Sequence, residues 1–137
     1  MLRSEMSQAY LEQSVMTAGP GELTLMLYEG CIRFLRKAKD SVAERNIQKS
    51  HEFFMKAEMI LRQLCDSLDM NYKMSEDLLN LYSFWIDEIT SANIDKNPDT
   101  VGQTIDPVID MLISLRDSWK EAVKSERKNG GVLYDEA

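Results

Sequence analysis

The chain has 137 residues, enough for one domain with a real hydrophobic core, and its 23 acidic and 16 basic residues give a formal charge of −7. This charge argues against nucleic-acid phosphates and anionic membrane surfaces as partners, and no stretch approaches the roughly 20 apolar residues of a membrane span. Because the N-terminus also lacks the apolar run of a signal peptide, we expect a cytoplasmic protein without membrane insertion.

The first long helix is predicted over about residues 20–44. Gly19 can serve as its N-cap, and Pro20 suits the first helical position because it has no N–H to leave unpaired. The apolar side chains of this helix form two adjacent stripes, one with Leu23, Leu27, Cys31, Phe34 and Ala38, the other with Leu25, Tyr28, Ile32 and Leu35. One core contact does not need both stripes, so we expect two partners for this helix.

Two further amphipathic helices follow. Asn46 can cap the second helix, and Ser75, after a polar connection at residues 69–74, is predicted to cap the third, which ends near Asn93. Their apolar positions recur at spacings of three and four: Phe53, Ala57, Ile60, Leu61, Leu64 and Leu68, then Leu78, Tyr82, Trp85, Ile89 and Ala92.

The fourth helix has an apolar seam and an internal proline. The seam consists of Val101, Ile105, Val108, Leu112, Leu115, Trp119 and Ala122. Pro107 predicts either a kink or a start at this point with Asp106 as cap. Four such helices with short loops predict an all-α, antiparallel up-down four-helix bundle over residues 17–124, with an N-terminal arm at 1–16 and a frayed tail at 125–137.

No catalytic, cofactor or metal site stands out in the sequence. Cys31 and Cys65 lie among apolar neighbours and are interpreted as reduced core thiols, and one histidine is too few for a di-iron bundle. His51 leaves one enzymatic alternative, a phosphotransfer domain, although Glu52 would repel a phosphoryl group there. We therefore expect no enzyme, no cofactor and no metal, with a generic helical adaptor as a further alternative.

Tyr10 and the block from Val15 to Leu35, which reads Val-Met-Thr-Ala-Gly-Pro-Gly-Glu-Leu-Thr-Leu-Met-Leu-Tyr-Glu-Gly-Cys-Ile-Arg-Phe-Leu, resemble the flagellar export chaperone FliS family. Further segments, at residues 56–64, 80–85, 92–94 and 115–119, are similar to the same family in the same order. The resemblance covers roughly residues 10–124. It implies a cytoplasmic chaperone that holds the C-terminal segment of flagellin, prevents premature polymerisation and hands flagellin to the type III export gate.

The resemblance also suggests where a client would bind. Flagellin's terminal segment forms an amphipathic helix, which an apolar groove can receive. The candidate client contacts are Tyr10, Val15, Leu25, Tyr28, Ile32, Leu35 and Asn93. For the four residues of the second stripe, the sequence leaves a second interpretation open, in which they face the other helices inside the bundle.

The N-terminal arm has an expected role, and the sequence departs from the family at two places. The arm, with Met6, Tyr10 and Val15, is expected to cover the groove when no client is bound. The connection at residues 70–74 lacks the family's glycine, and Asp87-Glu88 stands where family members often have a basic residue, so a client contact there is in doubt. Whether two copies pair weakly is left open.

Overall fold

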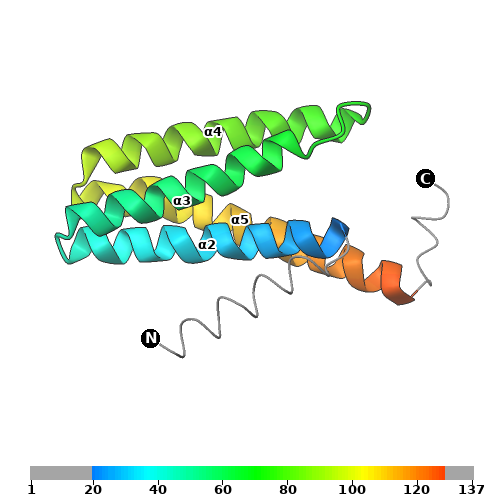
Figure 1. The fold of residues 1–137 in the computed structure, drawn as a ribbon, viewed down its shortest axis with the longest axis horizontal. Coiled ribbons are helices and arrows are strands. Elements are labelled where there is room, and N and C mark those ends of the chain that lie inside the picture. Colours follow the sequence, from blue (N-terminus) through cyan, green and yellow to red (C-terminus); the bar gives the residue numbers. More distant parts are fainter. Residues whose placement is uncertain (1–19, 129–137) are drawn as a thin grey trace.

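The structure, a computed structural model, describes residues 20–128, and within them it contains four α-helices joined by short turns. The helices are α2 (Pro20–Ala43), α3 (Ile47–Asp66), α4 (Lys73–Asp95) and α5 (Pro98–Lys128). Consecutive helices run in opposite directions, and they pack in a ring in which α5 returns to α2 (Figure 1). The predicted all-α antiparallel bundle is confirmed, and the predicted arm at 1–16 lies outside the described residues.

The helix starts follow the sequence signals at two of three places. Pro20 is the first residue of α2, and the Asn46 side chain accepts a hydrogen bond of 3.1 Å from the backbone N–H of Lys49 at the start of α3. Ser75, however, does not cap α4, which begins at Lys73. Its hydroxyl instead donates to the carbonyl of Asp69 at 2.6 Å, so it closes the α3–α4 turn from inside the first helical turn.

The region around Pro107 is one continuous helix. α5 runs from Pro98 to Lys128 with Pro107 inside it. The alternative in which the fourth helix starts at Pro107 is therefore wrong. Pro107 is exposed, which puts its missing N–H on the solvent side where the loss costs least. Asp106 forms an ion pair with Lys39 of α2 instead of capping a helix. Residues 125–128 are helical rather than frayed, and 129–137 lie outside the described residues.

Both apolar stripes of α2 contribute to the core. Tyr28, Ile32 and Leu35 of the second stripe are at most 2% exposed, and Cys31 of the first stripe is fully buried. This happens because α2 packs extensively against both α3 and α5, so each stripe meets a neighbouring helix. Burial raises the pKa of the Cys31 thiol to about 12, in agreement with an inert core cysteine. Cys65 is also a free thiol, half-buried.

The apolar seam of α5 is covered only over its first part. Val101, Ile105, Val108 and Leu112 are buried, Leu115 and Trp119 are half-buried, and Ala122 is exposed. The cover ends because α5 continues past the first residue of α2 (Figure 1). Trp119, which the sequence places on this seam, is therefore only partly covered.

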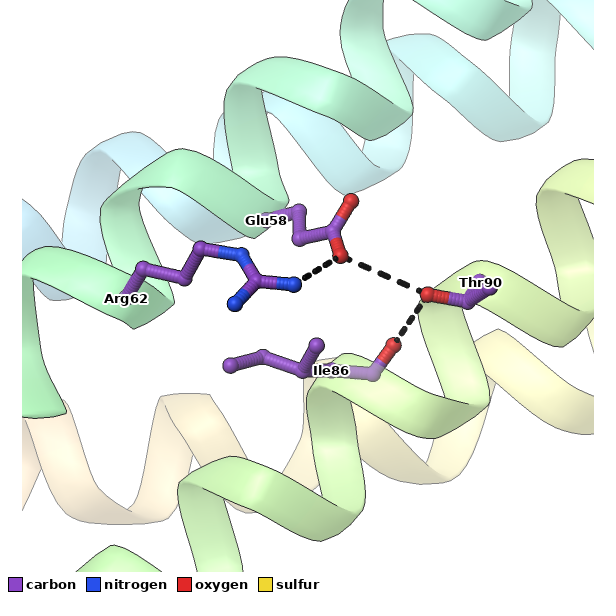
Figure 2. A network of polar contacts seen from close by, with 4 residues as sticks. All are labelled: Glu58, Arg62, Ile86 and Thr90. Atoms are coloured by element: carbon purple, nitrogen blue, oxygen red, sulfur yellow. Dashed lines mark hydrogen bonds and ion pairs between the residues drawn. The ribbon is translucent and has the colours of Figure 1, made fainter.

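Polar side chains cover the outer side of the α3–α4 contact (Figure 2). Glu58 accepts a hydrogen bond of 2.9 Å from Arg62 one turn along α3, and its carboxylate lies 3.4 Å from the Thr90 hydroxyl of α4. The Thr90 hydroxyl also donates to the carbonyl of Ile86 at 2.9 Å. Arg62 is exposed while the Glu58 side chain is mostly buried, and an ion pair one helical turn apart contributes about 0.3–0.5 kcal/mol when it is solvated.

Candidate functional site

The bundle is open at one end. Toward the α3–α4 turn, α3 and α4 diverge from the first turns of α2 and the second half of α5 (Figure 1). A groove of about 340 Å³ lies at this end, and all four helices contribute to its lining. It is larger than the pocket of about 100 Å³ that Ile47 and Lys96 line, and it is the candidate functional site.

The groove is lined mainly by apolar side chains. Leu64 comes from the last turn of α3, Leu68 from the connection after it, Leu78 and Tyr82 from the first half of α4, and Trp119 from α5. Trp119 is fixed by its indole N–H, which donates to the carbonyl of Gly21 at 2.7 Å. This bond joins α5 to the start of α2 and sets the width of the groove on that side.

The α3–α4 turn forms an apolar rim to the groove. Tyr72 and Met74 line it and are 64% and 69% exposed, and Met70 beside them is 55% exposed. The polar groups of the turn bond to one another, for example Ser75 to the Asp69 carbonyl and the Asn71 N–H to the Asp69 carboxylate. Three exposed side chains at this turn are thus large and apolar, in a position where turns are usually polar.

A pair of tyrosine hydroxyls lies at the base of the groove. The hydroxyls of Tyr28 on α2 and Tyr82 on α4 are 2.5 Å apart, and their rings are 6.5 Å apart at 53°. Burial raises the pKa of both tyrosines, and the hydrogen bond between the two hydroxyls raises the pKa of Tyr82 further. The pair thus remains neutral at physiological pH and connects α2 to α4 across the bundle.

These pKa directions predict a loss of stability in alkali. Because the folded-state pKa values exceed the ordinary value of about 10, the unfolded chain ionises first, and stability is full below about pH 10 and falls above it. We expect the free energy of unfolding in urea to fall as the pH is raised from about 10 to about 11.5, and less steeply in Tyr82→Phe. Cys31 titrates in both proteins, so an equal slope for both would contradict the assignment to the tyrosines.

The predicted client contacts of α2 lie mostly inside the bundle. Tyr28 lines the groove but is 2% exposed, and Ile32 and Leu35 are core residues that are not accessible on the described bundle. Leu25 is half-buried and is not part of the groove lining. The structure favours the interpretation in which this stripe faces the interior. Tyr10 and Val15 lie outside the described residues.

Asn93 lies near the opposite end of the bundle. It is about 20 Å along α4 from Leu78, from the rise of about 1.5 Å per residue. Its amide nitrogen is 3.1 Å from Nδ1 of His51, while its amide oxygen is buried without a hydrogen-bond partner among the described residues. The groove and Asn93 are thus two separate places.

The rim residues and Trp119 are not among the site residues that the sequence predicts. The signal was present, because Met70, Tyr72 and Met74 are apolar residues in a connection, where polar ones are typical. Trp119 stands near the end of a seam whose last position, Ala122, has no apolar helix face opposite it. The rim residues and Trp119 are far apart in the sequence, and they come together only through the packing of the helices.

Metal and membrane sites can be checked on the described residues. Residues 20–128 hold no group of three or more His, Cys, Asp or Glu side chains arranged for a metal ion. Among the four described helices, none combines the length and apolar character that crossing a membrane demands.

Comparison with known proteins matches the resemblance in the sequence. The family model of the flagellar protein FliS matches residues 3–126. The flagellar secretion chaperone FliS of Bacillus subtilis is 36% identical over 128 residues, covering 90% of this chain and 93% of that protein. The protein of that name in Escherichia coli is 28% identical over 132 residues, covering 91% and 94%.

A solved structure has the same fold. The crystal structure of a flagellar chaperone from bacteria superimposes with a TM-score of 0.70 at 23% identity, over 90% of this chain and 99% of that one. At this identity the likeness supports the four-helix architecture, while the family assignment rests on the sequence matches. Because the family model spans nearly the whole chain and a relative of the same name exceeds 30% identity, the chain belongs to the FliS family of flagellar proteins.

Proposed function

We propose that this chain is a cytoplasmic chaperone of flagellin, which holds the C-terminal segment of flagellin and assists its export through the flagellar type III apparatus. The observation that carries the proposal is an open apolar groove, with an apolar rim, on a member of a flagellar secretion chaperone family. Its action is binding, without a chemical step.

The chemistry of the groove suits an amphipathic helix. Leu64, Leu68 and Leu78 offer an apolar floor, and Tyr72 and Met74 can close over a client from the rim. Methionine side chains adapt to irregular partners, and a helix that lays its apolar face in such a groove hides the surface through which it would self-associate. A client bound here is therefore kept from premature assembly.

The predicted contacts away from the groove fit a client longer than one helix. A segment that leaves the groove along α4 and covers about 20 Å would reach the other end of that helix, where Asn93 lies. Leu25, Tyr10 and Val15 stay predictions, as does the expectation that the N-terminal arm covers the groove in the absence of a client. Contact with export-gate components and weak pairing of two copies also stay predictions.

The direct test is calorimetric titration of the full chain with a peptide from the C-terminus of the host's flagellin. We expect saturable one-to-one binding with a negative heat-capacity change, because the interface buries apolar surface. A peptide of the same composition in scrambled order should not bind. Lack of binding by the native-order peptide would overturn the proposal and leave a generic helical adaptor as the better description.

A further inference from the structure

Two aromatic rings and three cations meet on the outer side of the α2–α3 contact, away from the groove. Phe34 of α2 and Phe53 of α3 are stacked, with ring centroids 6.2 Å apart and planes at 22°. Both rings are half-buried, so one part of each faces solvent. The helices can approach closely just above this pair because Gly30 has no side chain, where a Cβ would lie 3.2 Å from Ile60.

The cations lie over these rings. Arg33 is 5.3 Å from the ring centroid of Phe34, Lys37 is 5.5 Å from that of Phe53, and Lys56 is within 5.8 Å of both. The side chains of Arg33, Lys37 and Lys56 are exposed. We call Arg33, Phe34, Lys37, Phe53 and Lys56 the basic aromatic patch.

The charge of the basic aromatic patch is not neutralised within the bundle. Four ion pairs are found among residues 20–128, and none involves Arg33, Lys37 or Lys56. This is unusual in a chain with 23 acidic residues and a net charge of −7. Even Glu52, one turn before Lys56 on the same helix, is not paired with it. The three cations thus lie over aromatic rings and do not form ion pairs with carboxylates.

We propose that the basic aromatic patch binds a short acidic segment of another protein, in which carboxylates flank an apolar side chain. In an extended segment, side chains two residues apart point to the same face, so an apolar side chain and the carboxylates two residues before and two residues after it can face the basic aromatic patch together. The apolar side chain between them then packs on the exposed edges of Phe34 and Phe53.

A nucleic acid fits the basic aromatic patch less well. Duplex DNA carries a charge every 1.7 Å or so along its axis, so it would extend from three cations onto a strongly acidic surface. A short segment is confined to the basic aromatic patch, where the remaining negative charge is screened beyond about 8 Å at physiological salt. The surface therefore selects acidic groups in a small, partly apolar segment.

The test uses a short fluorescent peptide with Glu-Asp pairs on both sides of one Phe. The full chain should bind it, more weakly as salt is raised, and the double variant Lys37→Gln with Lys56→Gln should weaken binding about tenfold, as expected from loss of two charge contacts. The matched control is Lys120→Gln with Lys124→Gln on α5, which removes the same charge from exposed positions and should leave binding unchanged.

Several outcomes would overturn the proposal. These are no binding at low salt, equal weakening in both double variants, or tighter binding of a single-stranded oligonucleotide than of the peptide. Amide chemical shifts should change at residues 33–37 and 53–56, and changes confined to the groove would also contradict it. Because none of the patch residues lines the groove, the patch variant should bind the flagellin peptide normally, so the two proposals fail independently.

Discussion

Replacing Tyr72 and Met74 together with glutamate is expected to weaken binding of the flagellin C-terminal peptide about a hundredfold. The two side chains are 64% and 69% exposed on the rim, so the change removes apolar contact area without opening a cavity in the core. Each lost contact is worth about 1–1.5 kcal/mol when partly buried by a client, and two such losses correspond to about two decades in affinity. Uncompensated carboxylates against an apolar helix add to this cost. Calorimetry of the purified variant measures the change.

The matched control introduces the same two negative charges at apolar residues that are about equally exposed but lie outside the groove. Ile47 and Met59 of α3 are 67% and 65% exposed and do not line the groove. Ile47→Glu with Met59→Glu should leave peptide affinity unchanged within about twofold, because a distant exposed charge acts weakly through solvent. If both variants lose affinity equally, the effect is one of net charge and the groove is not the binding site.

Two hydrogen bonds between helices mark where the closed part of the bundle ends and the groove begins. The Trp119 indole holds α5 against Gly21, and the Tyr28–Tyr82 pair joins α2 to α4 just beneath the opening. Beyond these two bonds, α3 and α4 continue into a turn whose polar groups bond to one another. The groove is therefore bounded by fixed contacts on one side and by exposed apolar side chains on the other.

Local signals predicted most of the architecture because they act within a few residues. The Asn46 cap, Pro20 at the first helical position and the apolar spacing of α3 each depend on one helix alone. Ser75 is not the cap because α4 begins two residues earlier, at Lys73, and its hydroxyl donates to the Asp69 carbonyl from within the helix. Pro107 was ambiguous because its cost depends on which side of α5 faces solvent, which is set by packing.

The site was harder to predict because it depends on the relative position of different helices. Two apolar stripes on α2 suggested a spare face, but two neighbouring helices cover both, and Ile32 and Leu35 become core residues. Which apolar side chains stay uncovered depends on where α2 begins relative to α4 and α5. No periodicity within one helix carries that information, whereas the three apolar residues in the otherwise polar stretch 70–74 carry part of it.

Replacing Phe54 with alanine is expected to lower the free energy of unfolding by about 3–5 kcal/mol, the range for removal of a buried aromatic ring. Phe54 is fully buried in the middle of the core, on the α3 side. Its ring also lies 5.7 Å from the ammonium group of Lys96, which ends α4 in a left-handed conformation and donates to Ser50 at 2.7 Å. The cavity would therefore loosen the α4–α5 turn as well as the core. Urea unfolding followed by circular dichroism measures the loss.

Two comparisons separate this stability effect from function. Met59→Ala on the same helix, at a residue 65% exposed, should change the free energy of unfolding by less than about 0.5 kcal/mol. Phe54 is about 15 Å along α3 from Leu64 in the groove, so Phe54→Ala should keep the affinity for the flagellin peptide at temperatures where it is folded. A folded Phe54→Ala variant that had lost binding would mean that the groove is shaped by the whole core, and that the tyrosine pair and Trp119 alone do not hold it open.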